Sequence, residues 1–374
     1  MPRISPALVR HAKQTDIRLA KLLPICRSLD SARNELRWLK QHASSIQSDN
    51  APADVLVNRL IARRAKGEPL QYILGSEYFG DLRLECRPGV LIPRPETAAS
   101  ISHLVDLLFQ SHTFRSLPRK LQVLDLCTGS GCLPLLFHHE YFKHNLRADT
   151  DIRLIGIDIS KRALKLARDN LSTQLIAQKA PSSLRSLQKT RFLRADVLHD
   201  ANIPHQFGIP SVLDALRTLE GTPTPPCFDI LISNPPYISS RAFLNTTARS
   251  VKLYEPKLAL VPQHPAPTCP VNDGDTFYPR ILDVARKLDA KVVLVEVGDM
   301  EQAVRVASLA IEQGLWDAVE IWRDEPGRQA PAEESVKIGD VCVFVRGVGY
   351  GRSVFAYRGS ATEWFASEKR VVSV

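Results

Sequence analysis

The most constraining feature of this chain is a largely apolar run, residues 228–233, that ends abruptly at Asn234-Pro235-Pro236-Tyr237. A short apolar run bounded by turn residues is typical of a buried strand. Pro235 and Pro236 each fix φ and lack a backbone N–H, so the strand cannot continue through them. The sequence therefore predicts a strand followed by a rigid loop that presents Asn234 and Tyr237.

This loop carries groups that suit a planar NH2 substituent. The side-chain oxygen of Asn234 and the carbonyl of Pro235 can each accept one hydrogen bond, so together they match the two donors of such a group. Tyr237 adds an aromatic face on which a flat amide or a base could lie. The alternative is a plain strand-to-loop turn, since Asn-Pro and Pro-Pro are ordinary turn dipeptides.

A second apolar run, residues 121–126, leads into the turn Cys127-Thr128-Gly129-Ser130-Gly131 and then into a predicted helix. Gly129 and Gly131 remove side chains where a ligand must approach the backbone, and the helix start offers free N–H groups. Pro134 stands where the third glycine of G-x-G-x-x-G would be, which argues against a dinucleotide. The turn predicts a different nucleotide-like ligand.

Two further predicted strands end in acids. Asp158 closes the run 152–158, and in nucleotide-binding sheets such a carboxylate accepts hydrogen bonds from ribose hydroxyls. Asp196 follows the next run, where it could accept from an adenine amino group while Val197 lines the ring edge. Both acids could also be ordinary strand-end residues. Ser160 is a plausible N-cap of the following helix. A ligand with ribose but no phosphate fits these residues better than a dinucleotide, and S-adenosylmethionine is the ligand we expect.

These patterns predict an α/β fold with a seven-stranded Rossmann-like sheet, because the candidate residues follow successive strands and open α/β sheets bind ligands at the carboxyl ends of their strands. Two late helices are expected at 276–288 and 300–313. The predicted strands are 121–126, 152–158, 191–197, 228–233, 290–297, 316–322 and 341–345.

The 374 residues are enough for two domains. Helical periodicity with polar breaks predicts a small helical bundle over residues 1–66. Apolar and polar residues alternate over 67–93, which predicts a hairpin or linker. The domain that binds S-adenosylmethionine is expected over 94–346. Residues 347–374 have little periodicity, so we expect a C-terminal tail.

The first 30 residues are rich in Arg and Lys and nearly free of acids before Asp30. They resemble a weak mitochondrial presequence, or they form a first helix with a solvated basic face. We expect a mitochondrial protein, with the cytoplasm as the alternative. The net charge of +9 fits a partner that works near ribosomal RNA but decides nothing alone.

Composition argues against several classes of protein. No run of eighteen apolar residues occurs, so no membrane span is expected. Seven cysteines without a C-x2-C pair argue against a zinc site and against a disulfide framework, so no metal is predicted.

Several motifs together resemble the HemK/PrmC family, the N5-glutamine methyltransferases that modify peptide-chain release factors. The resemblance lies in the segments 67–80, 88–97, 254–260 and 273–274, in addition to Asn234-Pro235-Pro236-Tyr237. It extends, with gaps, over roughly residues 55–345. Relative to the compact family pattern, insertions lie near 172–190, 200–226 and 262–271.

The resemblance implies roles for the candidate residues. Cys127, Thr128, Gly129, Ser130 and Gly131 would wrap the methionine part of S-adenosylmethionine. Asp158 would hold the ribose, and Asp196 and Val197 would flank the adenine. Asn234, Pro235, Pro236 and Tyr237 would form the catalytic loop that holds the glutamine. The chain departs from the family at Cys127, where glycine is commonest.

The implied function is methylation of the glutamine in the Gly-Gly-Gln motif of a release factor, with residues 1–66 recognising the substrate and the enzyme acting as a monomer. One alternative is an amino-methyltransferase acting on a DNA or RNA base, which faces the same chemical problem and would need the base flipped out. Another is a catalytically idle scaffold that only binds the cofactor.

Overall fold

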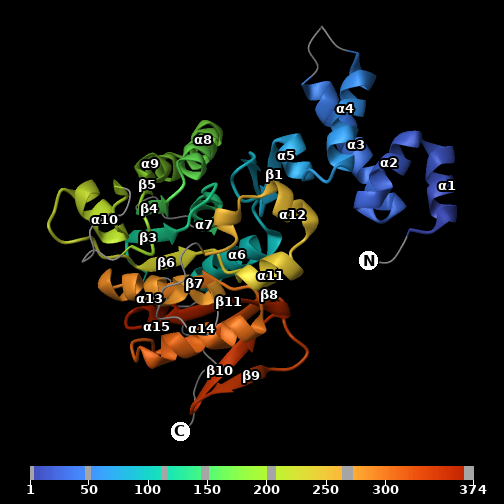
Figure 1. Cartoon of the computed structure of the whole chain (residues 1–374). Helices are drawn as coiled ribbons and strands as arrows, with labels where there is room; N and C mark the ends of the chain where they lie inside the picture. Colours follow the sequence, from blue (N-terminus) through green and yellow to red (C-terminus); the bar gives the residue numbers. More distant parts are fainter. Residues whose placement is uncertain are drawn as a thin grey trace.

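A computed structural model of the chain describes residues 4–46, 52–110, 117–144, 151–199, 208–262 and 273–365. Its N-terminal part is a helical bundle, which Figure 1 shows in blue to one side of the sheet. The bundle helices are α1 (Pro6–Thr15), α2 (Ile17–Cys26), α3 (Leu29–Ser45) and α4 (Ala53–Ala65).

Three of the four bundle helices begin where polar side chains cap them. Ser5, Asp16 and Ser28 each accept a hydrogen bond from a backbone N–H in the first turn of α1, α2 and α3. The apolar faces meet in a hydrophobic core that is separate from the core of the sheet and includes the fully buried Leu22 and Leu39. The bundle is therefore a unit with its own packing.

A short helix and a hairpin connect the bundle to the sheet. Helix α5 (Leu70–Leu74) ends at Gly75, whose φ of +74° suits glycine. Strands β1 (Ser76–Phe79) and β2 (Leu82–Glu85) then form an antiparallel pair. The predicted helical bundle and hairpin linker are both present.

The main sheet has nine strands in the order β5-β4-β3-β6-β7-β11-β8-β10-β9. Strands β3 to β7 pair in parallel with their neighbours, whereas β11 runs antiparallel between β7 and β8. The strands are β3 (Lys120–Leu126), β4 (Asp151–Asp158), β5 (Arg191–Arg194), β6 (Ile230–Ser233), β7 (Val292–Glu296), β8 (Ala318–Glu325), β9 (Glu334–Ile338), β10 (Val341–Arg346) and β11 (Val348–Tyr357).

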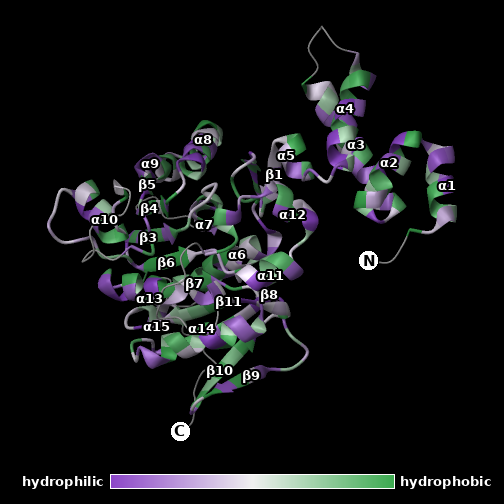
Figure 2. Cartoon of the chain, viewed as in Figure 1, coloured by the Kyte–Doolittle hydropathy of each residue, from purple (hydrophilic) through white to green (hydrophobic). Residues whose placement is uncertain are grey.

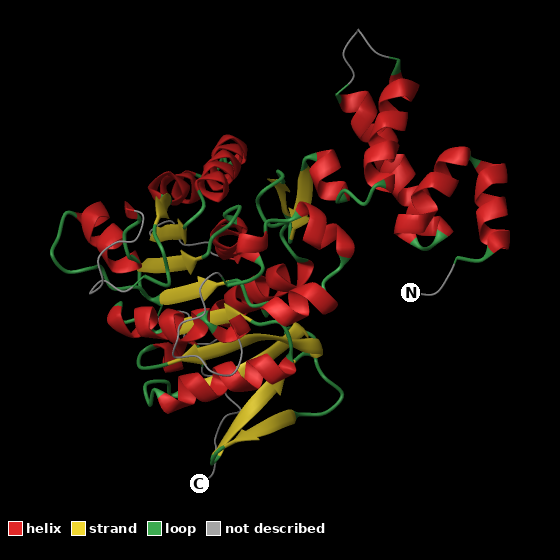
Figure 3. Cartoon of the chain, viewed as in Figure 1, coloured by secondary structure: helices red, strands yellow, loops and turns green. Residues whose placement is uncertain are grey.

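Helices cover both faces of this sheet, as Figure 3 shows. The larger helices are α6 (Pro95–Gln110), α7 (Cys132–His144), α8 (Lys161–Ala177), α9 (Pro181–Lys189), α10 (Val212–Glu220), α13 (Phe277–Lys287) and α14 (Met300–Glu312). The short ones are α11 (Ser240–Asn245), α12 (Arg249–Tyr254), η3 (Lys257–Ala259), η4 (Asp273–Asp275) and α15 (Ala361–Trp364).

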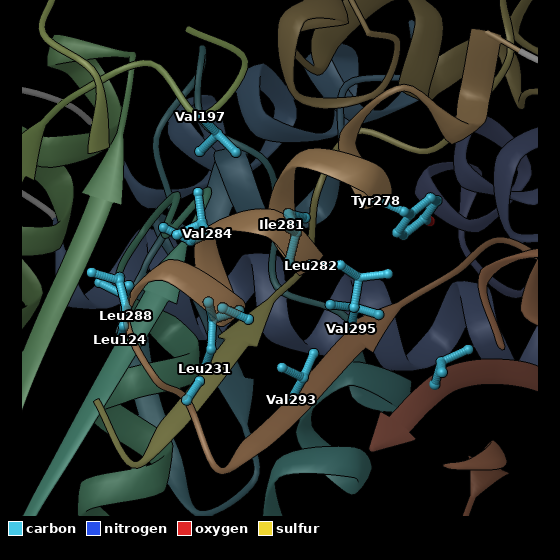
Figure 4. Close-up of a cluster of buried hydrophobic side chains, with 14 of the residues drawn as sticks. Leu124, Val197, Leu231, Tyr278, Ile281, Leu282, Val284, Leu288, Val293 and Val295 are labelled. Carbon is cyan, nitrogen blue, oxygen red and sulfur yellow. The ribbon is translucent and has the colours of Figure 1, made fainter. Parts of the chain in front are cut away.

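Alternate residues of each central strand enter different cores. In β7, Val293 and Val295 pack in a cluster with α13 and α14, part of which Figure 4 shows, while Val292 and Leu294 pack in a cluster with α6 and α7. Figure 2 shows hydrophobic residues concentrated on the central strands. Burial on both faces is expected for a parallel sheet and holds the strand ends rigidly.

The α/β prediction is confirmed, and all seven predicted strands are present with shifted bounds, but the strand count was wrong. The structure adds β9 and β11. The predicted tail at 347–374 is also wrong over its described part, because β11 lies in the middle of the sheet. Residues 353–357 are all buried, so this strand lacks the alternation that predicts one, and Gly349 and Gly351 weaken the signal further.

The predicted insertions are only partly described. The segment 172–190 forms the end of α8 and helix α9, and α10 lies within 200–226. Residues 200–207 and 263–272 lie outside the described residues, as do the ends of the chain at 1–3 and 366–374. Among the described helices, none combines the length and the apolar character that crossing a membrane requires.

Candidate active site at the carboxyl edge of the sheet

The candidate residues gather at one edge of the sheet. Strands β5, β4, β3 and β6 are adjacent and parallel, so their carboxyl ends point the same way. Residues 127–131 follow β3, Asp158 ends β4, Asp196 follows β5 and Asn234 follows β6. The four segments predicted from the sequence are therefore brought together along this edge.

Backbone amides hold the glycine-containing turn against β4. The Thr128 N–H donates to the Ile157 carbonyl at 2.9 Å, and the Gly129 N–H donates to Asp158 Oδ2 at 2.8 Å. Gly131 closes the turn by donating its N–H to the Thr128 carbonyl at 2.8 Å. The turn and the predicted ribose acid are thus one hydrogen-bonded unit.

Cys127 has a φ of +61°, a left-handed conformation that a residue with a Cβ adopts at a cost. This conformation accounts for the glycine that is commonest here in the family that the sequence resembles. Burial, and then the negative charge of Asp158, raise the pKa of the Cys127 thiol well above its usual value. The raised pKa favours the protonated thiol, which is a poor nucleophile.

Asp158 is bound by the backbone on both sides of its carboxylate. Oδ2 accepts from Gly129, and Oδ1 accepts from the Ser160 N–H at 2.8 Å. Burial raises its pKa, while these backbone hydrogen bonds oppose that rise. Ser160 caps α8, as predicted. Each carboxylate oxygen has a second lone pair, so Asp158 can still accept from ligand hydroxyls.

Asp196 and Val197 lie one strand further along the edge. Asp196 Oδ1 accepts from the Leu198 N–H at 2.9 Å, and Asp196 is half-buried. Val197 is buried in the hydrophobic cluster, and Figure 4 shows its side chain beside Val284 of α13. A contact from Val197 to a ligand at this edge would therefore come from its backbone.

Several polar side chains are buried at the turn. The Asp125 carboxylate and the hydroxyls of Thr128 and Ser130 are almost fully buried, with Thr128 next to Asp125 and Ser130 next to Cys132. Burial raises the pKa of Asp125 well above its usual value, a hydrogen bond from Thr128 opposes the rise, and the charge of Asp158 adds to it. Because these side chains are almost fully buried, a ligand at the turn would meet the backbone of residues 127–131, and the fit to S-adenosylmethionine rests on that backbone and on the Asp158 carboxylate.

The Asn234-Pro235-Pro236-Tyr237 loop follows β6 as predicted. Both prolines are buried, while Asn234 and Tyr237 are half-buried. The Tyr237 hydroxyl donates to Glu296 Oε1 at 3.1 Å, and the Tyr237 carbonyl accepts from Gln302 Nε2 at 3.3 Å. The loop is thus tied at both ends of Tyr237.

The Tyr237 ring also depends on Gly298. A Cβ on Gly298 would lie 3.2 Å from Tyr237 Cδ2, so a side chain there would press on the ring. Glycine at this position allows the ring to lie against the backbone after β7.

Sequence reasoning missed two residues beside Asn234. Thr97, in the first turn of α6, and Glu296, the last residue of β7, are both almost fully buried. The Asn234 Nδ2 donates to Thr97 Oγ1 at 3.3 Å, and the Thr97 hydroxyl donates to Glu296 Oε2. Neither position carries a spacing signal, although Thr97 stands in the motif at 88–97 and Glu296 is the one acid within the predicted strand 290–297.

An ion pair between the half-buried Arg94 and the buried Glu255 braces the entrance segment. Arg94 Nη2 lies 2.7 Å from Glu255 Oε1, and Glu255 Oε2 accepts from the Ile92 N–H at 3.2 Å. Nearby, the Tyr254 hydroxyl contacts the Lys66 carbonyl at 3.4 Å. These contacts join the segment before α6 and the end of the bundle to the segment that follows the Asn234-Pro235-Pro236-Tyr237 loop.

Comparison with known proteins identifies the group to which the chain belongs. It is 33% identical over 303 residues to the mitochondrial MRF1 N(5)-glutamine methyltransferase MTQ1 of Saccharomyces cerevisiae, covering 81% of this chain and 78% of the yeast protein. A probable mitochondrial MRF1 N(5)-glutamine methyltransferase of Schizosaccharomyces pombe is 34% identical, covering 68% of this chain and 71% of that one. The chain belongs to the release factor glutamine N5-methyltransferase family.

A bacterial relative extends the match. The release factor glutamine methyltransferase of Nitratidesulfovibrio vulgaris is 29% identical, covering 86% of this chain and 91% of the bacterial protein. Among solved structures, the N-terminal domain of human METTL16 in complex with SAH is similar, with a TM-score of 0.41, 14% identity and coverage of 78% of this chain and 81% of that one. No protein-family model matches the chain.

Membership of this family confirms the predicted activity: S-adenosylmethionine-dependent methylation of a release factor glutamine. A nucleic acid base as the substrate is correspondingly disfavoured. The two fungal relatives are mitochondrial by name, which is consistent with the predicted compartment, although bacterial members are also similar.

Proposed function

We propose that Asn234 and the carbonyl of Pro235 hold the side-chain amide of a Gly-Gly-Gln glutamine in a mitochondrial release factor while its nitrogen is methylated. The observation that carries this proposal is the Asn234 amide, half-buried at the carboxyl edge and tied through its Nδ2 to Thr97. Its Oδ1 remains as an acceptor. Pro236 stiffens the loop from the following position.

The chemistry requires such acceptors. A glutamine amide nitrogen is a poor nucleophile because its lone pair is delocalised into the carbonyl. Two acceptors on its N–H groups fix the amide and draw electron density onto nitrogen. Orientation of this kind can lower a barrier by on the order of 7 kcal/mol. After methylation the nitrogen releases a proton to a carbonyl or to water, so no strong base is needed.

Asp158, Asp196 and the turn at residues 127–131 would hold the methyl donor. Asp158 would accept from its ribose hydroxyls, Asp196 from its adenine amino group, and the backbone of the turn would meet its methionine end. When bound, S-adenosylmethionine supplies the methyl group from its sulfonium. The position of these groups next to Asn234 along one sheet edge supports the assignment.

The helical bundle is proposed to recognise the release factor. Its separate core and its placement to one side of the sheet leave it free to contact a macromolecule that also reaches the active site (Figure 1). The basic N-terminal stretch and the mitochondrial names of the two fungal relatives support a mitochondrial location. We propose a monomeric enzyme that meets its substrate near the ribosome.

The test is mass spectrometry of a recombinant mitochondrial release factor incubated with this protein and S-adenosylmethionine. The expected result is a gain of one CH2 on the Gly-Gly-Gln peptide, absent with Asn234→Ala. Label from the methyl group that appears in RNA or DNA instead would overturn the proposal. Label in neither would indicate the idle scaffold.

A further inference from the structure

A continuous hydrogen-bond network lies behind the catalytic loop and joins three elements that are distant in sequence. It runs from Asn234 Nδ2 to Thr97 Oγ1 at 3.3 Å and from the Thr97 hydroxyl to Glu296 Oε2. The Tyr237 hydroxyl reaches the other oxygen, Glu296 Oε1, at 3.1 Å. The loop after β6, the start of α6 and the end of β7 therefore share one carboxylate.

The carboxylate fixes the direction of every hydrogen bond in this network. An ionised Glu296 can only accept, so both hydroxyls must donate to it. The Thr97 hydroxyl has a single proton, and that proton is used in the hydrogen bond that Thr97 donates to Glu296. Toward Asn234, Thr97 can therefore only accept, which requires the Asn234 atom that faces it to be Nδ2. The Asn234 Oδ1 is left pointing away from the network.

Burial makes this direction hard to reverse. Thr97 is 3% exposed and Glu296 is 4% exposed, so water cannot readily replace a lost partner. A buried polar group that loses its partner bears its full desolvation penalty. In a solvent-exposed asparagine, by contrast, either end of the amide could face either neighbour.

We infer that Thr97 and Glu296 are positioning residues: they set the orientation of the Asn234 amide so that Oδ1, and not Nδ2, meets the substrate amide. This inference rests on the proposed function, because it concerns the group that Asn234 would present to the glutamine. If the Asn234 amide were turned the other way, its Nδ2 would face the NH2 of the substrate. Both groups are hydrogen-bond donors, so they would repel each other.

The surroundings of Glu296 give the network a pH signature. Arg352 from β11 and the Thr97 and Tyr237 hydroxyls favour its charged form, while burial, the largest influence, and Glu96 on α6 raise its pKa. Burial, and then the charge of Glu296, raise the pKa of the Tyr237 hydroxyl, and Arg352 and Arg94 only partly oppose that rise. A protonated Glu296 would donate from one oxygen and would no longer enforce the direction of the bonds. The kcat of the wild type should therefore fall on the acid side of its profile.

The experiment measures kcat and KM for S-adenosylmethionine and for the release factor in wild type, Glu296→Gln, Thr97→Val and Thr97→Ser. Glu296→Gln keeps the shape but places an NH2 against one hydroxyl. Thr97→Val keeps the shape but removes the acceptor for Asn234. Thr97→Ser is the matched control, because it keeps the hydroxyl and loses only a methyl group.

We expect kcat to fall by roughly 10- to 100-fold in Glu296→Gln and Thr97→Val, with an unchanged KM for S-adenosylmethionine. Thr97→Ser should retain most of the activity. The double variant Glu296→Gln/Thr97→Val should lose no more kcat than the more impaired of the two single variants, because both changes break one network. Glu296→Gln should also lack the acid limb of the wild-type pH profile.

Wild-type kcat in both Thr97→Val and Glu296→Gln, while Asn234→Ala is inactive, would overturn this inference and leave the proposed function standing. Equal losses in Thr97→Ser and Thr97→Val would also overturn it, since packing and not the hydroxyl would then matter. If Glu296→Gln does not fold, the Thr97 pair decides alone. A wild-type enzyme that does not methylate the release factor would overturn both proposals.

Discussion

The two halves of the candidate site are built in different ways. At the cofactor half, backbone amides of a glycine-containing turn bind an acid on the next strand, and Thr128 and Gly129 need only β4 beside them. At the substrate half, side chains from α6 and β7 hold Asn234 through Thr97 and Glu296. The cofactor half is thus a property of local backbone conformation, and the substrate half is a property of side-chain packing between distant elements.

This difference explains why one half was easier to recognise. Backbone conformation leaves a mark in the sequence, because Gly129 and Gly131 have φ values of +55° and +77° that other residues adopt at a cost. A threonine and a glutamate that meet across the sheet leave no spacing pattern. The two halves should accordingly respond differently to substitution.

The largest expected effect separates the halves by kinetics. Asn234→Ala should lower kcat by on the order of 10³-fold, because an acceptor for the substrate amide is lost, and should leave the affinity for S-adenosylmethionine nearly intact. Steady-state kinetics and calorimetric titration of the cofactor would measure the two. A parallel loss of cofactor affinity would show that the halves are not separate.

The converse substitution is Asp158→Ala. It removes the proposed ribose acceptor and the partner of the Gly129 and Ser160 N–H groups. We expect the dissociation constant for S-adenosylmethionine to rise roughly 10- to 100-fold, with little change in kcat at saturating cofactor. Unchanged cofactor binding in the folded variant would place the ribose elsewhere.

A smaller effect tests whether the backbone of the turn is as confined as its geometry indicates. A Cβ on Gly131 would lie 3.0 Å from Phe192 and 3.1 Å from Ala167, in addition to the strain of a φ of +77°. Gly131→Ala should therefore lower the free energy of unfolding by about 1–3 kcal/mol. Urea denaturation would measure it.

Gly314→Ala is the matched control for this prediction. Gly314 has a similar φ of +63°, but a Cβ there would meet nothing within 4 Å. It should show the strain of the left-handed conformation alone, which is about 1 kcal/mol. Equal losses at the two positions would mean that crowding at the turn contributes nothing.

The smallest expected effect is at Cys127. Cys127→Gly relieves a strained φ of +61° but loses packing against the sheet core and adds backbone entropy to the unfolded chain. These opposing contributions should keep the change in unfolding free energy within about 1 kcal/mol and leave cofactor affinity unaltered. A large loss of activity would instead give the thiol a role in the reaction.

Much of the fold followed from the sequence because each central strand is buried on both faces and appears as a short apolar run that ends in a polar residue. Asp158 and Asn234 could be placed on this basis. Burial on both faces also explains why β11 was not predicted. Its inner residues are buried without alternation, and its pairing between β7 and β8 is set by contacts with strands far away in the chain.

The sequence by itself determined where the residues proposed to touch ligand stand relative to the strands: the turn at 127–131, the strand-end acids and Asn234-Pro235-Pro236-Tyr237. Backbone conformation and strand ends are local properties, and glycine, proline and acidic residues record them directly. Only the tertiary structure decided which residues orient them. Thr97 and Glu296 are 199 positions apart, and what unites them is that α6 and β7 bring one hydroxyl and one carboxylate together behind the same asparagine.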